Sequence, residues 1–206
     1  MLYDCVIIGA GPSGLSAGLF TTMYGLSVVC LGDVFGGKVN IAPLIFDYPG
    51  VSTITGKEFI NGLKKQCERV HVETKSVIVD EVEKSPSNEM GLIFTVKTES
   101  HEMFIAKTLL LATGNGKKQK VNRGMQLGEK LGVHIENGFI VADDAKRTSV
   151  SGVFASGDCT HYPHSVEQLA TAVSSGIKAA VGIYEHINHS RPPILWGAAQ
   201  IPRPQS

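Results

Sequence analysis

The sequence has 206 residues, of which 43% are hydrophobic, and its 19 basic and 19 acidic side chains leave no formal net charge. These values are typical of a globular protein with one large domain or two small ones. The charge gives no reason to expect a nucleic-acid partner, because basic residues are not in excess. The sequence shows no signal-peptide pattern and no apolar run of membrane-spanning length, so we expect a cytoplasmic protein with no membrane partner.

The first part of the chain predicts a strand, a helix and a second strand. Residues 3–9 form a short apolar run that ends in glycine, as expected for a strand buried on both faces. Residues 12–25 place apolar side chains at helical spacing, and residues 26–32 form another apolar run. This order is typical of one mononucleotide-binding half of an α/β domain.

The middle of the chain predicts a helix followed by extended segments. Residues 55–71 have an apolar helical face, and Thr55 is a favourable N-cap. Residues 76–84, 91–99 and 101–114 are extended segments separated by polar turns. We expect them to form an antiparallel β-meander, inserted before the chain returns to a parallel sheet.

The last part predicts short strands within residues 138–144 and 151–158 and a long helix over 165–187. Ser165 and Gln168 are expected to form a capping box at the start of this helix. Its expected apolar stripe consists of Leu169, Val173, Ile177, Val181 and Tyr184. Residues 190–206 form a proline-rich tail without periodicity.

A glycine-rich loop joins the first predicted strand to the first predicted helix. It matches the G-x-G-x-x-G dinucleotide fingerprint, which is weak alone but specific between a buried strand and a helix. The first glycine permits a tight turn, the second lets the backbone approach a pyrophosphate, and the third lets the helix pack closely on the strand. The helix N-terminus then faces the anion. The expected contacts are Gly9, Gly11, Pro12, Ser13 and Gly14.

The acidic residue that usually follows this fingerprint by about 20 residues is displaced here. The second strand ends in leucine and glycine, and Asp33 is the nearest carboxylate. Asp33 is either a ribose contact or an exposed turn residue, and the sequence leaves both interpretations open.

The cysteines form no C-x-x-C pair, disulfide framework or zinc spacing, so we expect structural thiols. Cys159 has no neighbouring cysteine that would resolve a disulfide. His161 and His164 lack a matching ligand set and are interpreted as loop residues, so no metal site is predicted. The cysteines are Cys5, Cys30, Cys67 and Cys159.

Four segments, in this order, resemble the thioredoxin reductase family. They are YDCVIIGAGPSGLSAGLF, GGKVNIAPLIFDYPG, LLLATG and TSVSGVFASGDCTHYPHSVEQLATAVSSGIKAA. In that family a central NADPH domain, which carries the redox-active C-x-x-C, follows the ATG motif. Here little more than NGKKQKVNRG stands in its place.

The resemblance implies an α/β fold, namely a Rossmann-like FAD-binding domain with a parallel sheet and an antiparallel β-meander insertion. Residues 1–189 would form this single domain, with its two sequence halves joined near 115–124, and residues 190–206 would form the tail. FAD is the implied cofactor.

The resemblance also implies particular FAD contacts. Gly36 and Gly37 match paired glycines beside the flavin, and Asp158 matches an aspartate that binds the ribityl and pyrophosphate region. Gln168 and the amide of Leu169 would approach flavin N1 and the C2 carbonyl, where a helix N-terminus stabilises the negative charge of reduced flavin. The ATG turn contributes Thr113 and Gly114.

The sequence departs from the family beside the flavin ring. Asp47 replaces an asparagine near flavin O4 and N5, and a buried anion there is costly unless it is protonated or hydrogen-bonded. Lys38 replaces a glutamine and is a candidate partner for Asp47; the alternative is that both residues face solvent. Glu167 stands where the family commonly has arginine, which makes the local field less positive.

These observations predict an FAD-dependent oxidoreductase or electron-transfer flavoprotein, in which the flavin does the chemistry and no catalytic side chain is required. Its electron donor, ferredoxin or a reduced nicotinamide, and its acceptor are not identified by the sequence. A homodimer is expected by analogy. The alternative is a non-catalytic dinucleotide-binding or regulatory module derived from a reductase.

The tail contains Trp196, the only tryptophan of the chain. It either covers the flavin or the dimer surface, or belongs to a disordered terminus.

Overall fold

The computed structural model describes residues 1–87, 91–115, 123–161 and 166–195. The strands are β1 (Leu2–Ile8), β2 (Val28–Leu31), β3 (Glu73–Lys75), β4 (Val79–Ser87), β5 (Gly91–Thr98), β6 (Met103–Leu111), β7 (Ile135–Glu136), β8 (Phe139–Val141), β9 (Val153–Ala155) and β10 (Thr160–His161). The helices are α1 (Pro12–Met23), α2 (Gly56–Arg69), α3 (Arg123–Leu131) and α4 (Leu169–Asn188), with short 3₁₀ helices η1 (Gly37–Ile41) and η2 (Gly157–Cys159).

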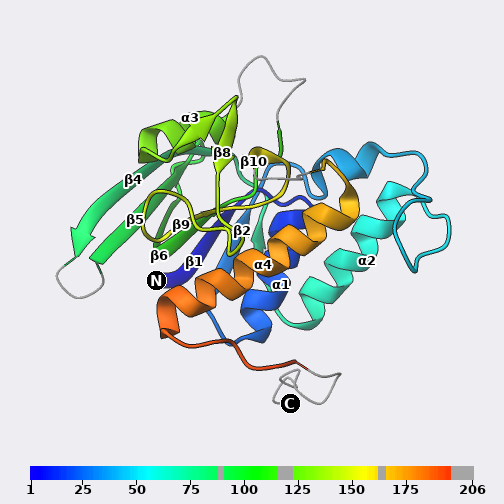
Figure 1. The fold of residues 1–206 in the computed structure, drawn as a ribbon, viewed down its shortest axis with the longest axis horizontal. Helices are drawn as coiled ribbons and strands as arrows, with labels where there is room; N and C mark the ends of the chain where they lie inside the picture. Colours follow the sequence, from blue (N-terminus) through cyan, green and yellow to red (C-terminus); the bar gives the residue numbers. More distant parts are fainter. Residues whose placement is uncertain (88–90, 116–122, 162–165, 196–206) are drawn as a thin grey trace.

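A parallel arrangement of β3, β2, β1, β6 and β9 joins the two halves of the sequence in one sheet. Ile8 pairs with Leu31 on one side and with Leu111 on the other. Leu111 in turn pairs with Ala155 of β9, and Leu31 with Lys75 of β3. The carboxyl ends of these strands are therefore aligned at one edge of the sheet (Figure 1).

β6 connects the parallel region to the antiparallel meander. Residues 109–111 pair in parallel with β9, whereas residues 103–106 pair antiparallel with β5, which pairs antiparallel with β4. The predicted α/β fold with a parallel sheet and a meander insertion is thus confirmed. A smaller sheet of β7, β8 and β10 lies outside this arrangement.

Both faces of β1 are buried, as its continuous apolar run predicts. Cys5 and Ile7 pack with residues of α1, α2 and α4, whereas Val6 and Ile8 pack with residues of the meander and α3. Figure 1 shows α4 lying beside α1. None of the helices in the described ranges has the length and apolar character that a bilayer crossing requires.

α4 buries a different face from the one that its apolar pattern predicts. The expected stripe is only partly buried, because α4 approaches α1 too closely for large side chains. A Cβ atom added at Gly176 would lie 2.1 Å from the carbonyl oxygen of Ser13. The buried face instead consists of Ser175, Gly176, Ala179, Ala180, Gly182 and Ile183.

The helix boundaries also correct part of the sequence interpretation. Thr55 caps α2 as predicted, since its hydroxyl accepts a hydrogen bond from the amide of Glu58 at 3.2 Å. The predicted start of α4 is wrong: residues 166–168 are not helical and Gln168 is the N-cap, while Ser165 lies outside the described residues. α3 and β3 were not predicted. β3 has only three residues, whereas α3 is amphipathic, with Met125, Leu127 and Leu131 buried, and its pattern was overlooked.

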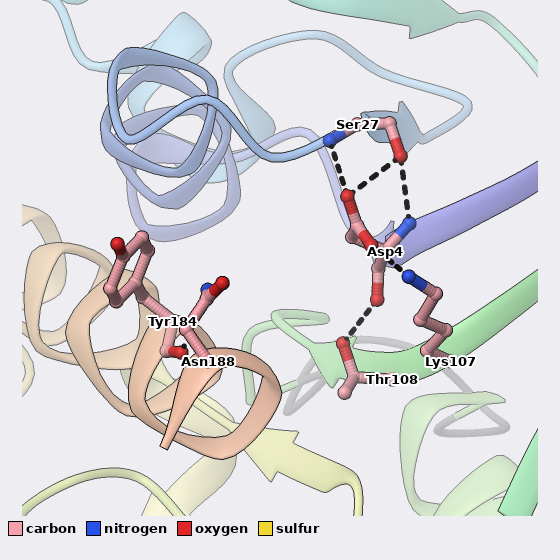
Figure 2. Close-up of polar contacts among 6 residues, drawn as sticks. All are labelled: Asp4, Ser27, Lys107, Thr108, Tyr184 and Asn188. Carbon is pink, nitrogen blue, oxygen red and sulfur yellow. Dashed lines mark hydrogen bonds and ion pairs between the residues drawn. The ribbon is translucent and has the colours of Figure 1, made fainter. Parts of the chain in front are cut away.

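Asp4 ties β1 to both of its neighbours (Figure 2). Its carboxylate accepts hydrogen bonds from the Ser27 amide and hydroxyl, both at 2.9 Å, and from Lys107 Nζ at 2.7 Å. Its backbone carbonyl accepts one from the Thr108 hydroxyl at 2.7 Å. Burial raises the pKa of Asp4, but the bonds from Lys107 and Ser27 lower it by more, so the net pKa is below its usual value. The ionised carboxylate therefore stabilises the register of the central strands.

Asp4→Asn should lower the free energy of unfolding by about 1–2 kcal/mol at neutral pH, because the bonds to an ionised acceptor are weakened. Since the folded pKa is depressed, this contribution is present above the unfolded pKa of about 3.9 and is lost as the pH falls through the folded value. Urea titrations at several pH values measure it.

The matched control is Asp144→Asn, which removes the charge of an exposed aspartate paired with Lys178 and should leave stability nearly unchanged. Equal effects of the two substitutions would contradict a special role for Asp4.

Candidate functional site

Loops that follow the aligned strand ends converge at one edge of the sheet. The Gly9 amide donates to Leu31 at 2.7 Å, and the Gly36 amide donates to Ala10 at 2.7 Å. The hydroxyls of Ser13 and Ser156 are 2.7 Å apart. The glycine-rich loop, the paired glycines and the segment before Asp158 are therefore brought together by direct contacts.

Close packing explains two glycines of the fingerprint. Gly9 has a φ of 114°, and a Cβ added there would lie 2.3 Å from the carbonyl oxygen of Ala112. A Cβ at Gly14 would lie 1.9 Å from the carbonyl oxygen of Gly9. Both distances are far below contact separations, so the tight turn and close helix packing expected from the sequence are present.

Gly11 differs, because a Cβ added there would meet nothing within 4 Å. Gly11 is the N-cap of α1 and Pro12 follows it; within the described chain, no side chain caps this end and its first turn has no acidic residue. The first amides of α1, Ser13 included, have no intrahelical partner. Open space in front of free amides and a positive helix end fits the pyrophosphate of a dinucleotide.

The paired glycines and the ATG turn border the same region. A Cβ on Gly37 would lie 3.7 Å from the Cα of Gly11, which places η1 beside the glycine-rich loop. Gly36 is buried against Ile60, and its φ of 87° suits glycine. Gly114 follows β6 with a φ of 68°, and a Cβ there would also meet nothing within 4 Å.

Asp158 lies just beyond β9, half-buried, at a pocket between η2, β8, β10 and the first turns of α4. The pocket lining includes Phe139, His161 and Glu167. The Gly157 amide donates to the Ser175 hydroxyl at 2.9 Å, which fixes the turn against α4. A carboxylate held at this position can accept hydrogen bonds from the hydroxyl groups of a ribityl chain.

The N-terminus of α4 opens on the same pocket, which Thr171 and Ala172 line. The Ala172 amide makes the first intrahelical bond, to the Gln168 carbonyl at 2.9 Å, so the Leu169 amide precedes the hydrogen-bonded turns. The Gln168 amide donates to the Thr171 hydroxyl at 3.2 Å. This end of the helix carries roughly half a positive charge, as stabilisation of an anionic ring requires.

Two aspartates proposed from the sequence as cofactor contacts, Asp33 and Asp47, are exposed, and the expected pairing of Lys38 with Asp47 is not observed. Asp33 is exposed, and its Oδ1 accepts a hydrogen bond from the Val34 amide at 2.9 Å. Asp47 is exposed and forms no ion pair with Lys38, which donates to Asn115 Oδ1 instead. The candidate Lys38–Asp47 pair is therefore absent, because Lys38 binds Asn115 in the turn after β6.

Asn115 is a site residue that sequence reasoning missed. It is 7% exposed, and its Nδ2 donates to Glu167 Oε2. The only sequence signal was an amide side chain directly after the ATG turn. Its two partners are distant in the sequence, so the contact depends on the tertiary structure.

The cysteines are all free and buried. Cys159 Sγ lies 3.3 Å from the Leu111 carbonyl and 3.2 Å from that of Ser156, and burial raises its pKa to about 11. A protonated, inaccessible thiol is a poor nucleophile, in agreement with a structural role. Among the described residues, no three histidine, cysteine or acidic side chains gather as metal ligands. His164 and Trp196 lie outside the described residues.

The family model described as pyridine nucleotide-disulphide oxidoreductase matches residues 48–176, more than half of the chain. The chain belongs to this family. FAD, predicted from the sequence, is the cofactor that membership implies, and when bound it supplies the electron-transfer chemistry.

Sequence relatives in the pyridine nucleotide-disulphide oxidoreductase family include two kinds of reductase. A thioredoxin reductase from Helicobacter pylori is 32% identical over 126 residues, which cover 60% of this chain and 39% of the relative. A ferredoxin–NADP reductase from Leuconostoc citreum is 35% identical over 122 residues, covering 56% and 34%. The chain thus spans well under half the length of these relatives.

Solved structures agree in fold. The atypical thioredoxin reductase TRi from Desulfovibrio vulgaris Hildenborough superposes with a TM-score of 0.78 at 21% identity, covering 91% of this chain and 98% of that one. A ferredoxin-flavin thioredoxin reductase from Clostridium acetobutylicum gives 0.76 at 18% identity, covering 92% and 98%.

Gly11→Ala should weaken FAD binding by about tenfold while costing less than about 1 kcal/mol of apoprotein stability, because the new methyl group enters open space in front of α1. Gly14→Ala should instead destabilise the fold by about 3 kcal/mol through overlap with the Gly9 carbonyl. Fluorescence titration of apoprotein with FAD and thermal melting separate the two effects.

Gly62→Ala is the matched control, because Gly62 is exposed in α2 with nothing within 4 Å of an added Cβ. It should leave FAD binding unchanged and slightly stabilise the helix. Unaltered FAD affinity in Gly11→Ala would contradict the assignment of the pyrophosphate to this loop.

Proposed function

We propose that this chain is an FAD-binding redox protein that passes electrons between a separate donor and a separate acceptor. The observation that carries the proposal is the convergence of the glycine-rich loop, the Gly36–Gly37 turn, the ATG turn and Asp158 at one edge of the sheet, with two helix N-termini facing it. One helix end suits a pyrophosphate and the other suits the ring.

The proposed roles follow from this placement. The glycine-rich loop holds the pyrophosphate through Gly9, Gly11, Pro12, Ser13 and Gly14. Asp158 accepts hydrogen bonds from hydroxyl groups of the sugar chain. Leu169 and Gln168, at the start of α4, stabilise negative charge on reduced flavin. The glycines at 36, 37 and 114, together with Thr113, keep the backbone close to the ring. Asp33 as a ribose contact and Asp47 near the ring remain proposals.

The proposed organisation is a single FAD domain over residues 1–189, its halves joined near 115–124. The sequence contains no second dinucleotide fingerprint and no C-x-x-C motif. Ferredoxin and NADP appear in the names of relatives, so reduced ferredoxin and reduced nicotinamide are the donor classes to test. The buried free cysteines favour a reducing compartment, so we propose a cytoplasmic protein, which fractionation of the source cells would test.

Purified protein loaded with FAD should be bleached by dithionite and recover with an acceptor, but react slowly or not at all with NADH or NADPH. The expected reason is that this sequence shows no second fingerprint to hold the nicotinamide over the ring, which would forgo the advantage of proximity. Anaerobic stopped-flow absorbance with NADH, NADPH and reduced ferredoxin in turn measures this.

Two results would change the proposal. Rapid, saturable reduction by NADPH at concentrations on the order of micromolar, as ordinary enzymes show, would contradict the prediction. A protein that binds a dinucleotide yet shows no redox turnover would favour the regulatory module.

We also propose that the chain forms a homodimer through the segment between β2 and α2. Ile45 is buried and bridges Ile54, so its neighbours Leu44 and Phe46 project outward, 54% and 76% exposed. Val34 and Ile41 are exposed in the same segment. Exposed apolar side chains gathered in one segment are typical of an interface.

Phe46→Asp should convert a dimer to a monomer in light-scattering measurements, because a charge would be buried at the interface. Met103→Asp, which alters a side chain of similar exposure on β6, is the control and should leave the mass unchanged. A wild-type chain that is monomeric at high concentration would refute the dimer.

A further inference from the structure

A polar bridge crosses the edge of the sheet where the cofactor loops meet. Lys38 Nζ donates to Asn115 Oδ1, and Asn115 Nδ2 donates to Glu167 Oε2. The residues come from three separate segments: η1, the turn after β6, and the approach to α4. One buried amide thus links a cation to an anion from a different segment of the chain.

Each residue of the bridge adjoins a proposed cofactor contact. Lys38 follows Gly37, which lies beside the glycine-rich loop. Asn115 follows the ATG turn, and Glu167 precedes Gln168 and lines the pocket that contains Asp158. The bridge therefore connects three segments to which cofactor contacts are assigned.

The amide fixes the polarity of this connection. Its carbonyl oxygen faces the ammonium group and its NH₂ group faces the carboxylate. Reversing the amide would place the NH₂ group against the ammonium group and the carbonyl oxygen against the carboxylate, and both contacts would be repulsive. Glu167 alone would offset the positive end of α4, and Lys38 supplies a compensating positive charge on the same network. Asn115 is buried, whereas Lys38 and Glu167 are exposed, so solvent screens the two charges in part and salt should weaken their effect.

We propose that Lys38, Asn115 and Glu167 form a charge-balanced clamp that positions the flavin-binding segments and sets the reduction potential of bound FAD. The inference rests on the proposed function. These are positioning residues, because they act through the segments that hold the cofactor and through the local field. Removal of either charge changes the local field in opposite directions, with opposite consequences for reduced flavin.

The test compares Lys38→Met, Glu167→Gln, the double variant, and Asn115→Leu. The midpoint potential should fall in Lys38→Met, because a positive charge that favours reduced flavin is lost, and rise in Glu167→Gln. In the double variant the changes should be non-additive. Asn115→Leu should weaken FAD binding about fivefold and abolish the coupling between the two charges.

Dye-equilibration redox titration, FAD titration of apoprotein and apoprotein melting are the readouts. Glu83→Gln and Lys97→Met are matched controls, since these residues form an exposed pair 2.7 Å apart on the meander, and they should shift neither potential nor affinity.

The two proposals fail in different ways. Wild-type protein that binds no FAD overturns both the proposed function and the clamp. Protein that binds FAD reversibly, but whose potential and affinity are unchanged in the bridge variants or move equally in the controls, overturns the clamp alone. Non-additivity that persists when Lys38→Met and Glu167→Gln are combined in the Asn115→Leu background overturns the role of the amide.

Discussion

The pairing of Ile8 with Leu31 on one side and Leu111 on the other is the constraint on which the site depends. A shift of one residue in either pairing would turn every side chain of a strand to the opposite face. It would also separate the loops that follow the strands. Asp4 stabilises this register by binding Ser27 before β2 and the side chains of Lys107 and Thr108 on β6. Ligands in such sheets bind beyond the carboxyl ends of the strands, where these loops lie.

Close backbone approach then fixes the position of the helices that border the site. Neither Gly14 nor Gly176 can accept a methyl group without overlapping a carbonyl oxygen. The same contact brings α4 against Ser13, whose hydroxyl lies beside that of Ser156. Packing of α1 on α4 and assembly of the site therefore use the same residues. Large side chains on the inner face of α4 would push α4 away from α1 and would disturb the site at the same time.

The electrostatic character of the site comes mainly from the backbone and from one polar bridge. Two helix N-termini supply positive potential, while Glu167 offsets it and Lys38 restores it through Asn115. The buried thiol of Cys159 keeps its proton and adds no charge. The redox chemistry proposed here therefore belongs to the cofactor, and the protein supplies position and field.

Local patterns of hydrophobic period, glycine and capping residues were sufficient to predict the fold class, the glycine-rich loop and the α2 cap. They also predicted the meander between the halves of the parallel sheet. The buried face of α4 could not be predicted in this way, because it depends on how closely α1 approaches. The partner of Lys38 depends on the fold as well: Asn115 lies 77 positions away along the chain, and only the shared edge of the sheet brings the two side chains together.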